Sequence, residues 1–494
     1  MFDNSLCRAV ICYRRYDRNI REKLRKTVII RKAPQKDFIM EQKAHFFSQD
    51  RNFYRSLFSM LVVVAMQNLI SYSVNMADNI MLGHYSQQAL SGAALVNQIF
   101  FMVNQLTVAV GDSLIVISSQ YWGQKRTEPV RRIAGTVLRI AFCVGIVIIV
   151  LCTVFSRQLL GIFTTDPEIL DQGEKYLSII KYTFLLLLLT QVLLATLRSV
   201  ETVKIAFYIS CVSLVINVCV NSTLIFGRFG FPELGIVGAA AGTIISRFVE
   251  LLIVVVFLLK KDKKLHLFAE GFPPAADAAL RSDYVRVAIP IITASMLWAV
   301  SVPLQTAILG HLSSDAIAAN SVATTFYQYM KVIVMAMSST SAVMMGKTVG
   351  KGDLEEVKAA GRTLSVIDVC IGLVLGSILF FTRGALLSYY KLNETAAILA
   401  DQLIVIMAAV MVGMSYQMPV GSGIIRGSGD TKFSLYLNMI STWGIVMPLS
   451  FAAAFLWKWP IPAVVLCLQS DQIFKGLPIF LRFRSYKWIH KLTR

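Results

Sequence analysis

Twelve apolar segments, each long enough to cross a lipid bilayer, follow one another along the 494-residue chain. A membrane-spanning helix needs about 20 mostly apolar residues. In this chain 56% of the residues are hydrophobic and 16% are charged, whereas ordinary soluble domains carry about a quarter charged residues. We therefore predict an all-α polytopic membrane protein with twelve transmembrane helices. The expected spans are residues 55–82, 90–121, 132–155, 173–196, 204–226, 235–259, 286–312, 316–346, 359–382, 398–422, 433–456 and 460–481.

The basic residues gather in alternate connections between these segments. The chain has 48 Lys and Arg against 29 Asp and Glu, a net charge of +19. The charge lies in short gaps rather than on one soluble face, which argues against a nucleic-acid-binding protein. The positive-inside rule then places both termini in the cytoplasm, and we expect a multi-pass plasma-membrane protein. The basic connections contain Lys125, Arg126, Arg131 and Arg132; Arg198 and Lys204; Lys260, Lys261, Lys263 and Lys264; Lys347, Lys351, Lys358 and Arg362; and Arg426 and Lys432.

The second half of the chain repeats features of the first. The tripeptide LGH at 82–84 recurs 227 residues later at 309–311, and Gly123 falls on Gly350 at the same offset. This pattern predicts two pseudo-symmetric six-helix lobes in a parallel repeat. Such repeats place the substrate site between the halves near the bilayer midplane, which is typical of an alternating-access transporter. The other matches are RRIAG at 131–135 with VKAAG at 357–361, after a one-residue slip, and Arg198 with Arg426.

The charge and hydropathy pattern also divides the chain into segments. Residues 1–39 carry eleven basic and four acidic residues and no apolar segment of a secretory signal. Three interpretations stay open for them: a basic arm on anionic lipid, a disordered tail, or a non-native extension before a translation start at Met40. The expected segments are a basic cytoplasmic N-terminal extension (1–50), an N-terminal lobe (51–259), a cytoplasmic linker (260–285), a C-terminal lobe (286–482) and a cytoplasmic tail (483–494).

Several separated motifs occur in an order that resembles the multidrug and toxic compound extrusion (MATE) family of cation-coupled efflux transporters. The resemblance extends from about residue 50 to the end of the chain. It implies a twelve-helix, two-lobed fold that exports organic, often cationic compounds in exchange for Na⁺ or H⁺, with no other cofactor. The motifs are MADNIMLGHYSQQALSGAALVNQIFF (76–101), SSQYWGQK (118–125), INVCVNSTLIFG (216–227), GIVGAAAGTIISR (235–247), GIIRGSGDTKFSLYLNMISTWG (423–444) and RFRSYKWI (482–489).

Four polar residues in the N-terminal lobe form the candidate coupling site. Asp78 lies near the outer end of the first span, and Asn217 and Asn221 lie one helical turn apart on the fifth. Thr243, on the sixth span, is expected at a similar depth. Their oxygens suit Na⁺ or a proton relay. The resemblance implies a cation site with an Asp, an Asn, a second Asp and a Thr at these places, so Asn221 replaces the second acid. A structural alternative is that Asp78 braces a helix end by hydrogen bonding to Asn217.

Other charges inside the spans are candidates because intramembrane charges are unfavourable without a function. We interpret Asp112 and Lys331 as possible inner-cavity charges, although Lys331 also fits a structural pair or a side chain that reaches the membrane surface. The roles of Asp368 and Asp471 stay open. Some family members carry acids in the C-terminal lobe, but the corresponding places hold Trp298 and Ser415, which argues against coupling there.

Three classes of function were compared on these features. A cation-coupled efflux transporter, monomeric in the bilayer and specific for small organic substrates, fits the repeat and the polar layer. A flippase of lipid-linked or amphipathic substrates needs a strongly cationic central cavity, for which Lys331 is the clear mid-membrane candidate. A membrane-embedded enzyme needs clustered catalytic side chains, and the five histidines show no metal-binding spacing. We therefore expect a transporter and not an enzyme; the substrate and the choice between Na⁺ and H⁺ are not determined by these features.

Overall fold

The structure is a computed structural model that describes residues 47–48, 50–268, 271–310, 314–388 and 394–493. The interpretations of residues 1–39 and of a start at Met40 lie outside these residues. The described chain contains helices and connecting segments, with one isolated antiparallel bridge between Gly429 and Ile489. Twelve of its helical stretches are long and apolar enough to cross a membrane. The predicted all-α fold with twelve transmembrane helices is confirmed.

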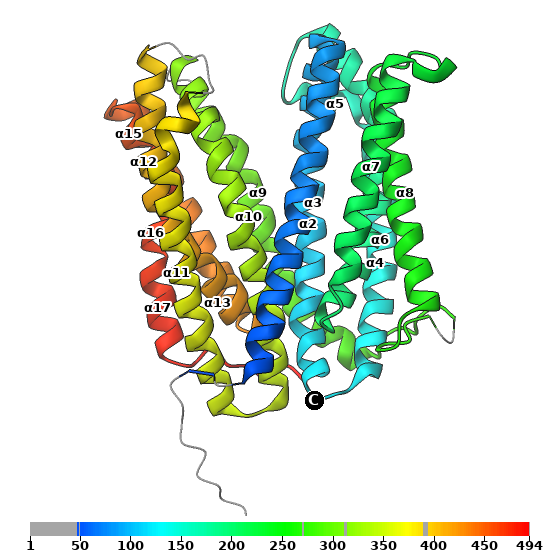
Figure 1. The fold of residues 1–494 in the computed structure, drawn as a ribbon, viewed down its shortest axis with the longest axis vertical. Coiled ribbons are helices and arrows are strands. Elements are labelled where there is room, and N and C mark those ends of the chain that lie inside the picture. Colours follow the sequence, from blue (N-terminus) through cyan, green and yellow to red (C-terminus); the bar gives the residue numbers. More distant parts are fainter. Residues whose placement is uncertain (1–46, 49, 269–270, 311–313, 389–393, 494) are drawn as a thin grey trace, which may run out of the picture. The chain divides into compact units, whose positions relative to one another are not determined.

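The helices agree with the predicted spans but extend one or more turns beyond most of them (Figure 1). The first six spans are α2 (Arg51–Tyr85), α3 (Gln87–Gly123), α4 (Thr127–Val154), α6 (Pro167–Ser199), α7 (Lys204–Phe226) and α8 (Ile236–Lys260), with the short α5 (Ser156–Gly161) and η1 (Arg228–Gly230) between them. The next three are α9 (Ala278–Gly310), α10 (Ser314–Lys351) and α11 (Leu354–Leu387). The last three are α12 (Glu394–Met418) with η2 (Pro419–Ile425); α13 (Thr431–Asn438), η3 (Met439–Val446), α14 (Met447–Phe451) and η4 (Ala452–Leu456); and α15 (Ile461–Gln469), α16 (Asp471–Phe474) and α17 (Gly476–Arg484).

Local sequence signals account for the helix starts. The side chains of Asp50, Ser86, Asp166 and Asp353 each accept a hydrogen bond from a backbone N–H of the first turn of the following helix. These N-caps satisfy donors that have no partner inside the helix. They also explain why the helices begin in polar residues outside the apolar segments that hydropathy detects.

The last three spans differ from the uninterrupted helices that hydropathy predicts. Segments η2, η3 and η4 are wound as π-helix. Pro419 and Pro448 lie at the first positions of η2 and α14, and a proline removes a backbone donor from the regular helical ladder. Hydropathy reports how apolar a segment is and not how its hydrogen bonds are arranged, so it does not detect these changes of winding.

The two halves of the chain pack in the same pattern. Within the first half α3 packs on α6, α4 on α6 and α2 on α7; within the second half α10 packs on α12, α11 on α12 and α9 on α13. When the six spans of each half are numbered in order, these contacts join the second and fourth, the third and fourth, and the first and fifth spans in both halves. The sequence repeat therefore corresponds to two pseudo-symmetric six-helix lobes.

The two lobes share a hydrophobic core at one end and have separate cores at the other. The shared core contains Leu57 and Tyr121 from the first half and Met344 and Trp488 from the second. Toward the opposite end, one core is built from the first half alone and another from the second half alone. We call the end with the shared core the basic end, because the basic connections lie there. Figure 1 shows the bundles meeting at this end, near the C-terminus.

Helices α3 and α10 approach each other at the basic end closely enough for backbone contact. A Cβ atom added to Gly123 would lie 2.1 Å from the carbonyl oxygen of Lys347, and one added to Gly350 would lie 2.1 Å from that of Gln120. From the sequence these glycines are members of a repeat and expected C-caps of long helices; the structure shows that they also permit the crossing of the two lobes. Gln120 and Lys347 are themselves separated by the repeat offset of 227, so the contact is pseudo-symmetric.

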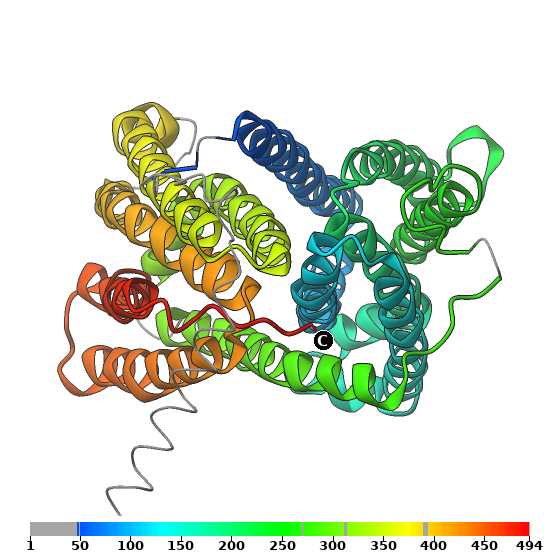
Figure 2. The ribbon, with the colours of Figure 1, turned by 90° about the horizontal axis from the view of Figure 1, so that it is seen from below.

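The chain beyond α17 connects the two lobes at the same end. His490 donates its backbone N–H to the carbonyl of Ser428 in the second half, while its own carbonyl accepts a hydrogen bond from the side chain of Gln120 in the first half. Leu492 donates to the same side chain at 2.8 Å. Figure 2 shows this segment crossing from the second half of the chain to the first.

Candidate functional site

The candidate coupling residues lie together in the first lobe. Asp78 stands seven residues before the end of α2, which is about 10 Å along the helix axis. Asn221, on α7, donates a hydrogen bond from Nδ2 to Oδ1 of Asp78 at 2.6 Å. The bond joins two helices that pack against each other. The structural alternative of a brace between Asp78 and α7 stays open, since the Asn217 side chain acts on the same carboxyl.

Asn217 lies one turn from Asn221 on α7 and close to the carboxyl of Asp78. Both asparagines are completely buried. The amide oxygens of Asn217 and Asn221 have no hydrogen-bond partner among the described residues, whereas the Asn217 amide also interacts with the Asp78 carboxyl. Buried polar atoms are nearly always paired with protein, water or an ion. These orphaned oxygens beside a carboxylate are free to accept a hydrogen bond or to contact a cation.

Helix α8 contributes Thr243 to the same layer. Thr243 donates its hydroxyl hydrogen to the carbonyl of Ala239, one turn earlier, which leaves the lone pairs of Oγ1 able to accept a hydrogen bond or bind a cation. Asp78 and Thr243 both line a cavity of about 20 Å³, which is room for one water-sized occupant. Four residues proposed from the sequence therefore come from three helices to one site.

Sequence analysis missed two further residues of this cavity, Tyr176 on α6 and Arg247 on α8. Arg247 forms an ion pair with Glu250, at 2.7 Å, but its side chain also borders the cavity and its charge acts on Asp78. Tyr176 is almost fully buried. Each is a polar side chain within an apolar span, which is a sequence signal of a functional residue. Neither the internal repeat nor the residue spacing, however, indicated that Tyr176 or Arg247 would lie near Asp78.

The layer combines one carboxylate with two amides, a hydroxyl and a phenol. Carboxylate, carbonyl and hydroxyl oxygens are the ligands of hard cations, and a buried carboxyl is also a proton acceptor in membrane transporters. Asp78 and Thr243, with the oxygens of the two asparagines, would hold Na⁺, and Asp78 alone would hold a proton. The donor set and the orphaned amide atoms fit either ion.

Asp112 lies outside this layer, toward the basic end of α3. It accepts a hydrogen bond from Nη2 of Arg426 at 2.6 Å, an ion pair between the two lobes. Arg198, which matches Arg426 in the repeat, donates to the hydroxyl of Ser339 in the other lobe at 3.0 Å. Ser339 follows Asp112 by the repeat offset of 227. The two contacts are therefore related by the pseudo-symmetry, and Asp112 lies in a contact between lobes.

Lys331 lies on α10, where its Nζ is 5.2 Å from the ring centroid of Trp298. Trp298 in turn packs against Phe101 of the first lobe, with ring centroids 6.0 Å apart. The lysine is thus adjacent to an aromatic contact between lobes and is separate from the layer around Asp78. Of the other charges, Asp471 pairs with Lys475 at 2.7 Å, a structural ion pair within the second lobe.

Comparison with known proteins shows the family of this chain. The MatE family profile matches residues 64–223 and 290–452, one block in each half of the chain. The chain belongs to the MatE family of multidrug and toxic compound extrusion transporters. Among curated MatE relatives it is similar to the probable multidrug resistance protein YoeA of Bacillus subtilis, with 23% identity covering 83% of this chain and 89% of that one. It is also similar to the probable multidrug resistance protein NorM of Thermotoga maritima, with 24% identity covering 85% and 90%.

Solved MATE structures have the same fold. A variant of the Vibrio cholerae MATE transporter VcmN superposes with a TM-score of 0.80 at 17% identity, covering 89% of this chain and 98% of that one. The expected multi-pass membrane transporter of the MATE family is confirmed. Membership describes the whole two-lobed fold, whereas the roles of Asp78, Asn217, Asn221 and Thr243 are proposed below from their geometry.

Proposed function

We propose that this MATE protein is a secondary active efflux transporter that exports organic, often cationic and amphipathic compounds by antiport with Na⁺ or H⁺. Asp78 is the residue that binds the coupling ion. The observation that carries the proposal is the partly buried carboxylate of Asp78, 2.6 Å from the amide of Asn221, in a layer whose two asparagine amide oxygens have no described partner. The loop charges support a plasma-membrane orientation with both termini in the cytoplasm.

The cycle needs two states with different affinity for the ion. Asp78 lies on α2 and its partners on α7 and α8, so ion binding joins three helices of one lobe. Arrival of a cation satisfies the orphaned oxygens of Asn217 and Asn221, and its release leaves them unpaired. Binding therefore changes which arrangement of these helices is stable, and substrate export follows from that change.

Reconstituted vesicles test the proposal. Dye efflux is measured under an imposed Na⁺ gradient and, separately, under an imposed H⁺ gradient, each collapsed in turn. We expect Asp78→Asn to abolish gradient-driven efflux, because asparagine keeps the size and hydrogen bonding but cannot change charge. Substrate binding to the folded variant should persist without dependence on Na⁺ or pH. Asp401→Asn is a matched control, since Asp401 is an acid paired with Arg383 on the partly exposed end of the second lobe.

Thr243→Val separates the two ions. Valine removes an oxygen ligand but keeps the shape, so Na⁺-driven efflux should fall more than H⁺-driven efflux. Gradient-driven efflux by Asp78→Asn at the original rate would show that the coupling site lies elsewhere.

A further inference from the structure

A buried carboxyl without a described hydrogen-bond partner lies in the other lobe, away from the site described above. Asp368 is in the middle of α11, with 1% of its surface exposed. Neither carboxyl oxygen has a hydrogen-bond partner among the described residues. Burial of an ionised carboxylate without a partner is so unfavourable that the group takes up a proton or a cation instead. Asp368 therefore needs an occupant that its neighbours do not supply.

The wall opposite Asp368 is the end of α12. Helices α11 and α12 are in close contact one turn away, where a Cβ added to Gly372 would lie 2.6 Å from Cβ of Ser415. The hydroxyl oxygen of Ser415 is buried and has no described partner. The Tyr416 phenol interacts with the Ser365 side chain and with the charge of Asp368. Polar side chains of both helices thus lie where α11 packs on α12.

The backbone at this contact is also unusual. Immediately after Ser415 and Tyr416, α12 continues as the π-helix η2, which begins at Pro419. Such π segments inside α-helices occur frequently at functional sites. The repeat gives a second indication, because alignment of VKAAG with RRIAG places Phe142 at the position that matches Asp368. An acid is therefore not required by the scaffold that the two lobes share.

The charged groups on the helices packed against Asp368 are engaged elsewhere. No lysine, arginine or carboxylate of these helices acts on its charge in the described part of the chain; the phenol of Tyr416 is the titratable group that faces it. On α10, α11 and α12 the described charged contacts are Lys331 with Trp298, Lys347 with Glu201, Lys351 with Glu356, Lys358 with Glu355, Arg362 with Tyr486 and Arg383 with Asp401.

We propose that Asp368, beside the Tyr416 phenol where α11 packs on α12, is a second proton-binding site of this transporter. A hydronium ion gives its proton to one carboxylate oxygen: one O–H bond of hydronium breaks, one forms on the carboxyl, and water is released. The carboxyl is then neutral and donates a hydrogen bond to the Tyr416 hydroxyl oxygen. A metal cation fits less well, because hard cations take about six or more oxygen ligands and the close approach of α11 and α12 leaves few. The site is separate from Asp78 and does not depend on the function proposed for it.

Infrared spectroscopy of the purified full-length protein in lipid nanodiscs tests the proposal. At neutral pH the wild type should show the carbonyl stretch of a protonated carboxylic acid, and Asp368→Asn should lose it. Asp401→Asn, which changes a partly exposed and ion-paired acid, should keep it. Asp78→Asn is measured in parallel. If the Asp78 proposal is wrong, this variant retains gradient-driven efflux. If the Asp368 proposal is wrong, the carbonyl band is unchanged in Asp368→Asn.

Stability against pH provides a second measurement. If the folded protein holds a proton on Asp368 that the unfolded chain releases, folding binds one extra proton above the ordinary carboxyl range of about pH 4. As the pH rises above this range, the ratio of folded to unfolded wild type should then fall by up to about tenfold for each pH unit, relative to the same ratio for Asp368→Asn. If the Asn variant does not accumulate, Asp368→Leu provides the same comparison. An equal pH dependence in wild type and variant would overturn the proposal, as would stabilisation by NaCl over choline chloride that requires Asp368.

Discussion

At the scale of single residues, the feature with most consequence is the replacement of a second acid by Asn221. The resemblance to the MATE family leads us to expect a carboxylate there, and the structure places the amide 2.6 Å from Asp78. Close approach of Asn221 to α8 is possible because Gly242 has no side chain: an added Cβ would lie 1.9 Å from Oδ1 of Asn221. The layer therefore contains one carboxylate. A relative with two carboxylates at these places would surround a bound cation with more negative charge.

We predict that Asn221→Asp increases the dependence of efflux on Na⁺. Two carboxylates at this separation repel each other unless a cation lies between them. The Na⁺ concentration for half-maximal efflux should fall by about tenfold, equivalent to about 1.4 kcal/mol. Asn221→Ala is the control, because it removes the hydrogen bond without adding charge and should lower efflux with no gain in Na⁺ affinity. The same Na⁺ response in both variants would contradict the explanation.

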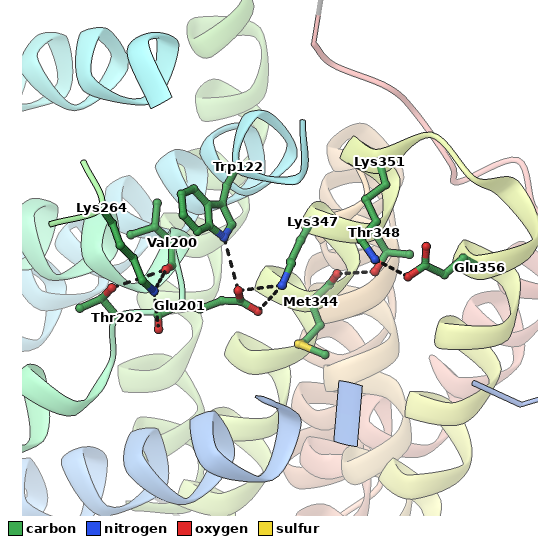
Figure 3. A network of polar contacts seen from close by, with 10 residues as sticks. All are labelled: Trp122, Val200, Glu201, Thr202, Lys264, Met344, Lys347, Thr348, Lys351 and Glu356. Atoms are coloured by element: carbon green, nitrogen blue, oxygen red, sulfur yellow. Dashed lines mark hydrogen bonds and ion pairs between the residues drawn. The ribbon is translucent and has the colours of Figure 1, made fainter. Parts of the chain in front are cut away.

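At the scale of helices, the crossing of α3 and α10 decides how closely the lobes approach. Gly123 and Gly350 allow each backbone to touch the other, since the atoms that an added Cβ would meet are carbonyl oxygens and cannot rotate away. Ion pairs surround this crossing. Figure 3 shows Lys347 bound to both carboxylate oxygens of Glu201, at 2.8 and 2.7 Å, with the indole of Trp122 on the same carboxylate.

The linker after α8 joins this network. Lys264 donates to the carbonyl of Val200 at 2.7 Å (Figure 3). Burial lowers the pKa of Lys264 from its ordinary value, and the charge of Glu201 opposes that shift whereas the charge of Lys347 adds to it. The carboxylate of Glu201 thus balances two lysines, one on each side of the contact between lobes.

We predict that Gly350→Ala destabilises the protein by about 1–3 kcal/mol, the usual range for overpacking a close contact. Its Cβ would overlap the carbonyl oxygen of Gln120, so α10 must move away from α3. Thermal unfolding of the purified protein measures the change. Gly384→Ala is the matched control, because Gly384 also lies in a helix but has nothing within 4 Å of an added Cβ. Its stability should stay the same or rise by up to about 1 kcal/mol, the difference in helix propensity; equal losses in both variants would contradict the prediction.

At the scale of the whole molecule, pseudo-symmetry relates the contacts between the lobes but leaves one of them without an acid. Arg426 meets the carboxylate of Asp112, whereas Arg198 meets the hydroxyl of Ser339. A hydrogen bond to a charged group, as between Arg426 and Asp112, contributes about 1.5–3 kcal/mol to stability. In the transport cycle proposed above, these contacts break when the basic end opens, so their strength would set how easily it opens.

We predict opposite effects for two substitutions at these equivalent positions. Ser339→Asp supplies Arg198 with a carboxylate and should raise the melting temperature while slowing efflux several-fold. Asp112→Asn removes a charge from the pair with Arg426 and should lower the melting temperature. Efflux rate under a fixed gradient and thermal unfolding measure both effects. A melting temperature that moves in the same direction in both variants would contradict the role given to the pairs.

The sequence by itself determined the class of fold and the count of spans, because apolar length is a local property that each segment carries alone. It also identified Asp78, Asn217, Asn221 and Thr243 as residues of similar depth, since helical rise and span boundaries set depth without knowledge of neighbours. The repeat, read as matches between the halves, was sufficient to expect two lobes.

Only the tertiary structure decided which polar residues meet. The pairing of Asp112 with Arg426, the addition of Tyr176 and Arg247 to the cavity of Asp78, and the absence of a described partner for Asp368 depend on which faces of distant helices pack together. Hydropathy is nearly uniform around a membrane helix, since lipid and protein interior are both apolar, so the sequence carries little information on helix rotation. Packing between helices sets that rotation, and with it the partner of each buried charge.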